Sequence, residues 1–287
     1  MSVGARTESR PTRVLVMSPG AGGMSEEVER KLRRAFSDHQ IVDVQSSEEL
    51  PQIVSSQARI VVAGGDGSVE LVVRTFAETQ HPIGIVPLGT FNNLANALHL
   101  PHDLDRAIEV AREGRARPIT LGRVNDHIFV EACAIGLFGE TILLGDAAKD
   151  RKFGDLSEHL KNVITAGRFG YELTGDIEGS GYAMSLVFSN TGSIGSQLHI
   201  AESSPLNPYL ELSIHAGRSR GDIARRAILA ALTRKRAETK ADQVFKFKRI
   251  VIKTKPRVRV YADNFLAGRT PATVTAETSA LKVLLPE

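Results

Sequence analysis

The sequence predicts an α/β domain with a doubly wound, mostly parallel sheet, followed by a second domain of antiparallel, sandwich-like strands. Two observations predict this fold class. Short apolar runs alternate with amphipathic helical stretches up to about residue 122, and strand-like runs dominate after it. A chain of 287 residues is long enough for both domains. We expect a disordered N-terminal arm at 1–12, the α/β domain at 13–122 and the β-rich domain at 123–287.

The first half of the chain contains the elements of the α/β domain. Ser25 is the expected N-cap of a first helix, because Glu26 and Glu27 follow it and an apolar stripe begins at Val28. Gly114 is the expected end of a later helix. The expected elements are strands at 13–17, 41–44, 59–63 and 83–86, and helices after Ser25, at 48–56 with Pro51 in the first turn, and at 104–113.

The second half begins with a hairpin signal. Asn125-Asp126 is a turn pair between two strand-like runs, 117–124 and 127–135. Further strands are expected at 171–177, 182–189, 209–215, 244–254, 257–262, 272–276 and 281–285, and helices near 139–150, 155–168 and 223–232.

Two glycine-bearing turns follow consecutive strands of the first domain. The run at 59–63 leads into Gly64-Gly65-Asp66-Gly67-Ser68, and the run at 83–86 leads into a turn that spans 87–95. Both turns should lie side by side at the carboxyl edge of a parallel sheet, where α/β proteins bind ligands. The glycines allow a phosphate chain to approach backbone N–H groups and a helix N-terminus. Asp66 would repel phosphate unless a cation such as Mg²⁺ lay between them.

Composition limits the class of protein. The apolar fraction is 42% and the charged fraction 24%, values typical of a globular protein. The single cysteine, Cys133, excludes an internal disulfide and is compatible with a reducing cytosol. No apolar run reaches about 18 residues and no signal peptide leads the chain, so we expect a cytoplasmic protein. The absence of tryptophan and of a recognised motif argues against nucleic-acid binding. The sequence leaves the oligomeric state open, and a homodimer is compatible with it.

Basic residues are concentrated in one segment, 218–259, although the net charge is only +3. Three acidic residues, Asp222, Glu238 and Asp242, oppose fifteen lysines and arginines there. An apolar stripe on the expected helix at 223–232 has basic flanks. This segment suits peripheral docking on an anionic membrane. A helix packed on the core with a solvated polar face is the alternative, and for the helix alone it is the favoured explanation.

The two glycine turns resemble the diacylglycerol kinase catalytic-domain family, which includes bacterial diacylglycerol and YegS-like kinases and sphingosine kinases. The family motifs GGDGT and P-x-GT-x-N-D-x-A correspond here to GGDGS and PLGTFNNLA. The resemblance implies a lipid kinase of phospholipid metabolism that uses ATP and Mg²⁺ and transfers the γ-phosphoryl group to a lipid hydroxyl. Asp66 would be both a metal ligand and a catalytic residue, and Asp263 a candidate base. The implied nucleotide site comprises Ser18, Pro19, Gly20, Gly22, Ser46, Gly64, Gly65, Asp66, Gly67, Ser68, Glu70, Gly89, Thr90 and Asn92.

The second half departs from the family pattern. Phe265 occupies the position of the glutamate in the family's D-G-E motif, although Asp263 is retained. Asn93 replaces an aspartate, and the segment 204–209 lacks the carboxylates of a family Mg²⁺ site. Two interpretations stay open: an active kinase in which Asp66 or Asp263 accepts the proton, or a catalytically impaired protein that binds nucleotide or lipid. The intact GGDGS motif favours the active kinase.

A dinucleotide fingerprint is the alternative interpretation of the first turn. Gly20-Ala21-Gly22-Gly23 follows the first strand, and Asp43 lies about twenty residues later, where a ribose-binding acid would be expected. Ser25 replaces the third glycine. An NAD-dependent oxidoreductase would leave the two later turns unexplained. In the lipid kinases this first turn is usually N-P-x-x-G and contacts the nucleotide, and Ser18-Pro19-Gly20-Ala21-Gly22 differs from it at the first position.

Overall fold

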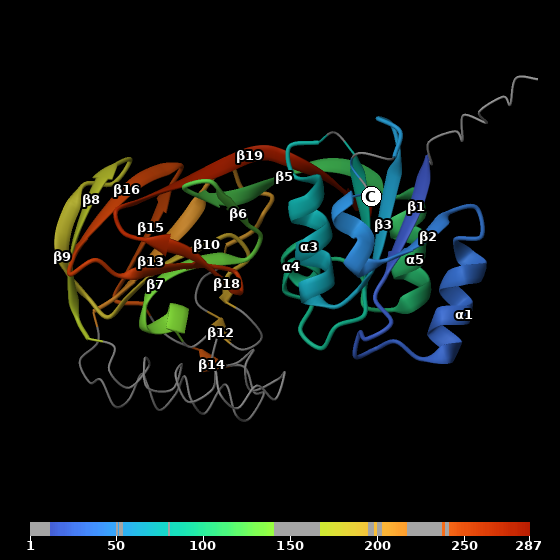
Figure 1. Ribbon diagram of the computed structural model, residues 1–287, viewed down its shortest axis with the longest axis horizontal. Helices are drawn as coiled ribbons and strands as arrows, with labels where there is room; N and C mark the ends of the chain where they lie inside the picture. The colour runs from blue at the N-terminus through green and yellow to red at the C-terminus, as the bar shows by residue number, and fades with distance from the viewer. Residues whose placement is uncertain are drawn as a thin grey trace, which may run out of the picture. The chain divides into compact units, whose positions relative to one another are not determined.

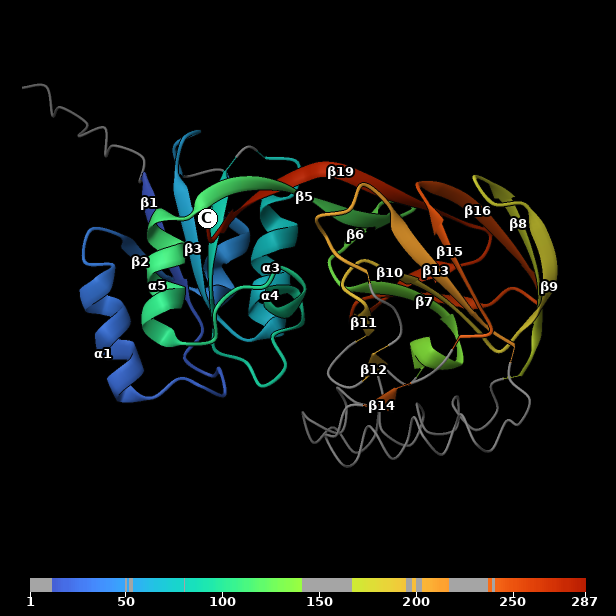
Figure 2. The same cartoon turned by 180° about the vertical axis from the view of Figure 1, so that it is seen from behind.

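The computed structural model describes residues 12–49, 51, 54–79, 81–140, 167–194, 198–199, 203–216, 237–238 and 241–287. These residues form two compact units, drawn from opposite sides in Figure 1 and Figure 2. The first unit comprises residues up to 92 together with 100–117 and 281–287, and the second comprises 93–99 and 118–280. The chain therefore returns to the first unit with its final residues, 281–287. The predicted division into 13–122 and 123–287 does not include this return.

The first unit is built on a parallel sheet with the strand order β2-β1-β3-β4-β19. Its strands are β2 (Gln40–Asp43), β1 (Arg13–Met17), β3 (Arg59–Gly64), β4 (Pro82–Pro87) and the end of β19 (Ala272–Leu285). All neighbouring pairs are parallel, and β19 joins through Lys282 and Val283 opposite Pro82 and Ile83. β1 and β3 are almost entirely apolar and buried, as strands covered on both faces must be.

Helices cover the sheet. α1 (Glu26–Ala35) and α5 (Leu104–Glu113) share one apolar cluster with alternate residues of β1, β3 and β4. α3 (Asp66–Phe76) buries Val69, Val72, Val73 and Phe76, and it contacts β3, β4 and the 3-10 helix η1 (Val44–Glu49). The predicted caps are confirmed: the Ser25 Oγ accepts the Val28 N–H at 3.2 Å, and Gly114 ends α5. The predicted α/β class of this half is therefore confirmed.

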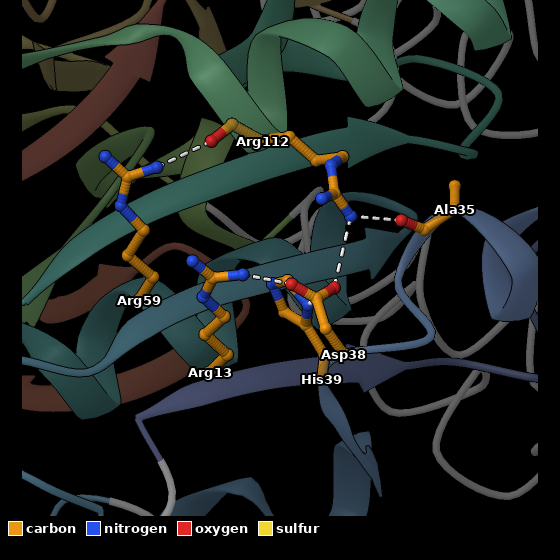
Figure 3. A network of polar contacts seen from close by, with 6 residues as sticks. All are labelled: Arg13, Ala35, Asp38, His39, Arg59 and Arg112. Carbon is orange, nitrogen blue, oxygen red and sulfur yellow. Dashed lines mark hydrogen bonds and ion pairs between the residues drawn. The ribbon is translucent and has the colours of Figure 1, made fainter.

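A polar network fixes the C-terminal end of α1 (Figure 3). The Asp38 carboxylate accepts hydrogen bonds from Arg13 on β1 and from Arg112 on α5. His39 Nδ1 lies 2.9 Å from Asp38 Oδ1, and Arg112 also donates to the Ala35 carbonyl. One carboxylate thus joins three elements that lie far apart in the sequence.

The second unit contains antiparallel sheets around a separate apolar core. A six-stranded sheet has the order β15-β13-β10-β7-β17-β18, and β16, β8 and β9 form a second antiparallel path with the first part of β19. Side chains from both sets, among them Phe188, Leu212, Phe247, Ile250 and Val274, form one buried cluster. The elements are α4 (Asn93–Ala97), β5 (Arg115–Val124), β6 (His127–Phe129), β7 (Ala132–Gly136), β8 (Phe169–Gly175), β9 (Gly179–Ala183), β10 (Ser185–Ser189), β11 (Ser193–Ile194), β12 (Leu198–His199), β13 (Leu210–His215), β14 (Ala237–Glu238), β15 (Gln243–Phe247), β16 (Arg249–Lys255), β17 (Arg259–Ala262) and β18 (Phe265–Arg269).

Several sequence-based bounds are wrong. Within the expected helix at 48–56, residues 48 and 49 belong to η1, Pro51 is helical and 54–56 are not, while 50, 52 and 53 lie outside the described residues. η1 begins directly after β2, where the Asp43 Oδ1 accepts the Gln45 N–H. The expected strand at 244–254 is interrupted at Lys248, and the two last expected strands are one strand, β19. Residues 141–150, 155–166 and 223–232, where helices are expected, lie outside the described residues. In the described part, no helix combines the length and the hydropathy needed to span a bilayer.

Candidate active site

Three turns adjoin at the carboxyl ends of β1, β3 and β4. The Gly23 N–H donates to the Leu88 carbonyl at 2.8 Å, and the Leu88 N–H donates to the Gly64 carbonyl at 2.8 Å. A Cβ added to Gly89 would lie 2.8 Å from the Gly65 Cα. Glycine is therefore required where the two motif turns touch, because any side chain there would push them apart. The two turns lie side by side, as the sequence predicts.

Asn92 closes the second turn. Its backbone is in the left-handed region, with φ of 50°, which asparagine tolerates better than most residues. Its Oδ1 accepts the Gly89 N–H at 2.8 Å and its Nδ2 donates to the Gly89 carbonyl at 2.9 Å. The Asn92 N–H donates to Asp66 Oδ2 at 3.0 Å. Asn92 therefore shapes the turn from inside, and the Asp66 carboxylate links this turn to the first one.

The N-terminus of α3 is open to a ligand. Gly65 is its N-cap and no side chain caps the helix. The Ser68 N–H donates to the Gly65 carbonyl at 3.0 Å, and the N–H groups before it lie ahead of the helical ladder. Gly67 and Thr90 are exposed, and a Cβ added to Gly67 would have no neighbour within 4 Å. Backbone donors, helix dipole and free space together fit a phosphate chain.

Asp66 is the candidate metal ligand of this turn. It is half-buried, and in the described part of the chain no three His, Cys, Asp or Glu side chains converge to hold an ion. Mg²⁺ is often held by one or two carboxylates together with nucleotide oxygens and water. Asp66 thus fits an ion that arrives with a nucleotide and does not fit a cage made of protein groups alone.

The remaining predicted site residues differ in their environment. Pro19 and Gly20 are exposed after β1, and a Cβ on Gly22 would lie 3.5 Å from the Thr90 Oγ1. Ser68 packs on Gly64, since a Cβ added to Gly64 would lie 2.7 Å from the Ser68 Cβ. Ser18 also lines this contact, Glu70 is buried within α3, and Ser46 lies in η1 with its side chain outside the described part.

Asp263, the candidate base in the second unit, is buried and accepts three backbone hydrogen bonds. Its Oδ2 accepts the Val130 N–H at 2.8 Å, and its Oδ1 accepts the N–H groups of Glu131 and Ala132 at 2.9 and 3.2 Å. Only 6% of the residue is exposed, and its φ is 45° in the turn between β17 and β18. A carboxylate that accepts three amide hydrogens is stabilised as the anion and is a poor proton acceptor.

Glu131 is a buried carboxylate that the sequence analysis did not identify. Only 3% of Glu131 is exposed, and Asn93 Nδ2 lies 3.1 Å from each of its carboxylate oxygens. Asn93 is itself 3% exposed. The sequence carries a signal for this residue, because Glu131 is the single charged residue within the apolar run from Ile128 to Phe138.

The positions that depart from the family pattern have structural contacts of their own. Phe265 packs against the core of the second unit and against the His127 ring, with ring centroids 5.5 Å apart. In the segment 204–209, the Asn207 carbonyl accepts from the Thr120 Oγ1 at 2.6 Å and the Pro205 carbonyl accepts from the Thr120 N–H. Neither position supplies a carboxylate.

The residues that form these turns lie in a part of the chain that matches a known protein family. The family model described as "Diacylglycerol kinase catalytic domain" matches residues 14–124, which include all three turns. Residues 14–124 belong to the diacylglycerol kinase catalytic-domain family. A diacylglycerol kinase of Staphylococcus carnosus is 40% identical over 85 residues, and one of Staphylococcus aureus is 35% identical over 79 residues. These matches cover 28% and 27% of this chain and only 27% and 25% of the two relatives.

Solved structures extend the likeness of fold over the whole chain. A putative diacylglycerol kinase from Bacillus anthracis superposes with a TM-score of 0.69 and 20% identity, covering 98% of this chain and 99% of the other. An NAD kinase from Archaeoglobus fulgidus in complex with ATP gives 0.56 and 12%, covering 96% and 93%. At these identities the likeness shows the fold alone. The predicted fold class, α/β followed by antiparallel sheets, is confirmed.

Proposed function

We propose that the chain is an ATP-dependent lipid kinase. The single observation that carries the proposal is the pair of adjoining glycine turns at the open N-terminus of α3, in a domain of the diacylglycerol kinase family. In the reaction, a lipid hydroxyl oxygen forms a bond to the γ-phosphorus of ATP, the bond to the bridging oxygen breaks, ADP leaves and the hydroxyl proton passes to a base. The relatives' name supports a diacylglycerol-like acceptor.

The turns would do the positioning that phosphoryl transfer requires. Gly65 and Gly67 bring backbone N–H groups to the phosphates, and Thr90 adds an exposed hydroxyl from the neighbouring turn. Asp66 would hold Mg²⁺, which neutralises charge on the phosphates when it is bound. Because Asn92 donates to the Asp66 carboxylate, the metal ligand is kept in a fixed orientation.

A nucleotide-binding protein without kinase activity is the second candidate function. Phe265 packs against the core and has no proton-accepting group, and Asp263 accepts three amide hydrogens, so neither late position provides an evident proton acceptor. The loose transition state of phosphoryl transfer demands little activation of the attacking hydroxyl. We therefore favour the kinase, with Asp66, which is half-buried in the first glycine turn, as the carboxylate at the proposed phosphate site.

The deciding experiment is transfer of label from γ-labelled ATP to a total lipid extract, with and without Mg²⁺. Asp66→Asn keeps an oxygen that can accept the Asn92 N–H, so the turn should persist while a metal ligand is lost. We expect at least a roughly 100-fold loss of transfer, the scale of losing one group that stabilises transition-state charge. Wild-type protein that binds nucleotide but labels no lipid would favour the binding function, and absence of both would refute both proposals.

Gly67→Ala tests the phosphate contact separately from the metal. Its Cβ enters open space, so the fold should keep its stability, yet the methyl group would stand where phosphate oxygens approach. We expect nucleotide binding about tenfold weaker, equivalent to about 1.4 kcal/mol. Gly179→Ala on β9 is the matched control, because its Cβ also meets nothing within 4 Å. Equal nucleotide affinity in the two variants would contradict the proposed site.

We also propose peripheral association with anionic membranes through basic residues of the segment 218–259. Much of that segment lies outside the described residues, but Lys246, Lys248, Arg249, Lys253 and Lys255 are exposed on β15 and β16 or between them. Each exposed cation contributes about 1 kcal/mol at an anionic surface. Vesicle pelleting should therefore fall steeply between low and high salt, and a salt-independent bound fraction would count against this association.

A further inference from the structure

An arginine-rich cavity lies in the second unit, separate from the residues assigned above. It has a volume of about 260 Å³ and is lined at the ends of β7, β8, β17 and β18. Its cationic side chains are all arginines: Arg168, Arg257, Arg259 and Arg269. Glu140 is the single acidic residue of the lining. The lining residues therefore carry a formal net charge of +3, and Arg168, Arg257 and Arg269 are exposed to solvent.

The placement of two of these arginines costs stability. Arg259 and Arg269 are direct partners across the antiparallel β17–β18 pair. Like charges directly opposite one another in a sheet are destabilising. Glu140 Oε1, 3.5 Å from Arg259 Nη1, compensates one of them in part. An arrangement that folding alone does not favour is explained if a bound anion supplies the missing negative charge.

The guanidinium group of Arg257 is held in place for such an anion. Arg257 Nε donates to the Thr270 carbonyl at 2.6 Å, which leaves its terminal nitrogens for another acceptor. Arginine binds phosphate through two parallel hydrogen bonds, whereas lysine acts as a point charge. The nearby strand β16 carries lysines instead, at Lys253 and Lys255. The choice of arginine in the cavity therefore points to a phosphate group.

Glu140 favours a ligand that can also donate a hydrogen bond. The residue is 9% exposed, and its Oε2 is buried without a hydrogen-bond partner among the described residues. A buried acceptor left unsatisfied costs free energy, so a ligand that donates a hydrogen bond to it is favoured. A protonated phosphate oxygen or a hydroxyl next to the phosphate can donate. The cavity is below the roughly 300–1,000 Å³ of sites for drug-sized ligands, so a whole nucleotide is too large for it.

We infer that this cavity is a binding site for a phosphate monoester, distinct from the proposed nucleotide turns and independent of kinase activity. Arg257, Arg259 and Arg269 bind the phosphate oxygens, and Glu140 accepts a hydrogen bond from the ligand. The phosphate belongs either to a small soluble ester or to the headgroup of a lipid such as phosphatidate. Both sources present the same group to the cavity.

The test variant is Arg269→Gln in the full chain. Removing one of two opposed arginines should leave the free energy of unfolding unchanged or raise it, because repulsion is relieved. Phosphate affinity should fall at least about tenfold, the scale of one charge-assisted hydrogen bond. A residue with a purely structural role would not shift stability and affinity in opposite directions. Arg117→Gln, at an exposed arginine of β5 outside both the cavity and the segment 218–259, is the matched control.

Two arms distinguish the sources of the phosphate. Calorimetry with glycerol 3-phosphate measures the soluble ester, and pelleting with phosphatidylcholine vesicles containing phosphatidate or an equal charge of phosphatidylserine measures the headgroup. Arg269-dependent binding of glycerol 3-phosphate assigns a soluble ligand. Arg269-dependent preference for phosphatidate over phosphatidylserine assigns a lipid. If neither probe binds, or if Arg269→Gln and Arg117→Gln bind equally, the inference is overturned.

Discussion

The Asp263 carboxylate binds three backbone N–H groups of its own unit. Its two oxygens accept the N–H groups of Val130, Glu131 and Ala132, and its own N–H donates to the Ala132 carbonyl at 2.8 Å. The left-handed turn at Asp263 suits aspartate, since few other side chains adopt positive φ readily. The residue therefore joins the β17–β18 turn to the start of β7.

Asp263→Asn should destabilise the fold by about 2–4 kcal/mol, because an amide can accept with one oxygen only and leaves buried N–H groups unsatisfied. Urea unfolding measures the loss. Asp126→Asn, the same change at an exposed turn residue, should cost less than about 0.5 kcal/mol. A variant of unchanged stability that has lost phosphoryl transfer would instead identify Asp263 as the base.

Asn93 and Glu131 form a buried amide–carboxylate pair where the family usually has aspartate at the position of Asn93. Asn93→Asp would place two carboxylates at the 3.1 Å contact, so we expect a loss of about 3 kcal/mol or more. The double change Asn93→Asp with Glu131→Asn restores one charge and one amide and should recover most of that loss. Unfolding of the two single variants and the double variant forms a thermodynamic cycle. Additive effects of the two substitutions would contradict the pairing.

Sequence reasoning found the glycine turns because their residue types are dictated locally. Gly64 and Gly89 leave no room for a side chain, and such positions leave a pattern in the sequence. It did not find the contacts of Asp263 or the Asn93–Glu131 pair. These depend on segments 38 to 133 residues apart, whose meeting is decided by strand pairing in the folded chain.

At the scale of elements, helix positions followed from local chemistry and strand ends did not. Ser25 and Gly114 mark the ends of α1 and α5 through hydrogen bonds made within a few residues. The expected helix at 48–56 differs in its bounds, because helical turns begin earlier, at Val44, where the Asp43 Oδ1 accepts the Gln45 N–H directly after β2. β15 and β16 appear as one strand-like run in the sequence, yet they belong to different sheets that separate at Lys248. The sequence pattern alone does not show that these two strands belong to different sheets.

The network at the end of α1 predicts a pH-dependent stability (Figure 3). Burial lowers the pKa of His39 below its ordinary value of 6.5, although Asp38 opposes the shift. The folded state therefore prefers the neutral imidazole, and the unfolded state gains protons first as the pH falls. Stability should be constant above about pH 7 and should fall as the pH drops below 6.5. The hydrogen bond from His39 lowers the pKa of Asp38. The stability contributed by the ionised Asp38 carboxylate is therefore lost only as the pH falls below the ordinary pKa of 3.8.

Urea unfolding between pH 5 and 8 measures this dependence. His39→Gln should flatten the curve in that range, because the group that titrates is removed. His102→Gln, at an exposed position after α4, is the control and should keep the wild-type slope. Parallel curves for the wild type and His39→Gln would show that another group titrates.

At the scale of the whole molecule, the chain order and the compact units do not coincide. β19 begins in the second unit, opposite β16, and ends in the first unit, opposite β4. Sequence reasoning placed one boundary near residue 122, since the composition changes there only once. The apolar residues at 281–285 look like any strand, and nothing local reveals which sheet they join. The fold class could be predicted, whereas the return of the last strand could not.

Truncation after Ala280 tests the importance of this return. It removes Leu281, Val283, Leu284 and Leu285, all at most 4% exposed. Each buried side chain contributes about 1.5–3 kcal/mol, so together they approach the 5–15 kcal/mol that stabilise a typical domain. We expect loss of hydrogen-exchange protection in β4, which pairs with the missing strand, and in β3 beyond it, with stronger protection kept in β7 and β10. Truncation after Leu285 removes only the exposed Pro286 and Glu287 and should leave both sheets protected. Equal protection of β4 in the two truncated proteins would mean that the first unit does not need its last strand.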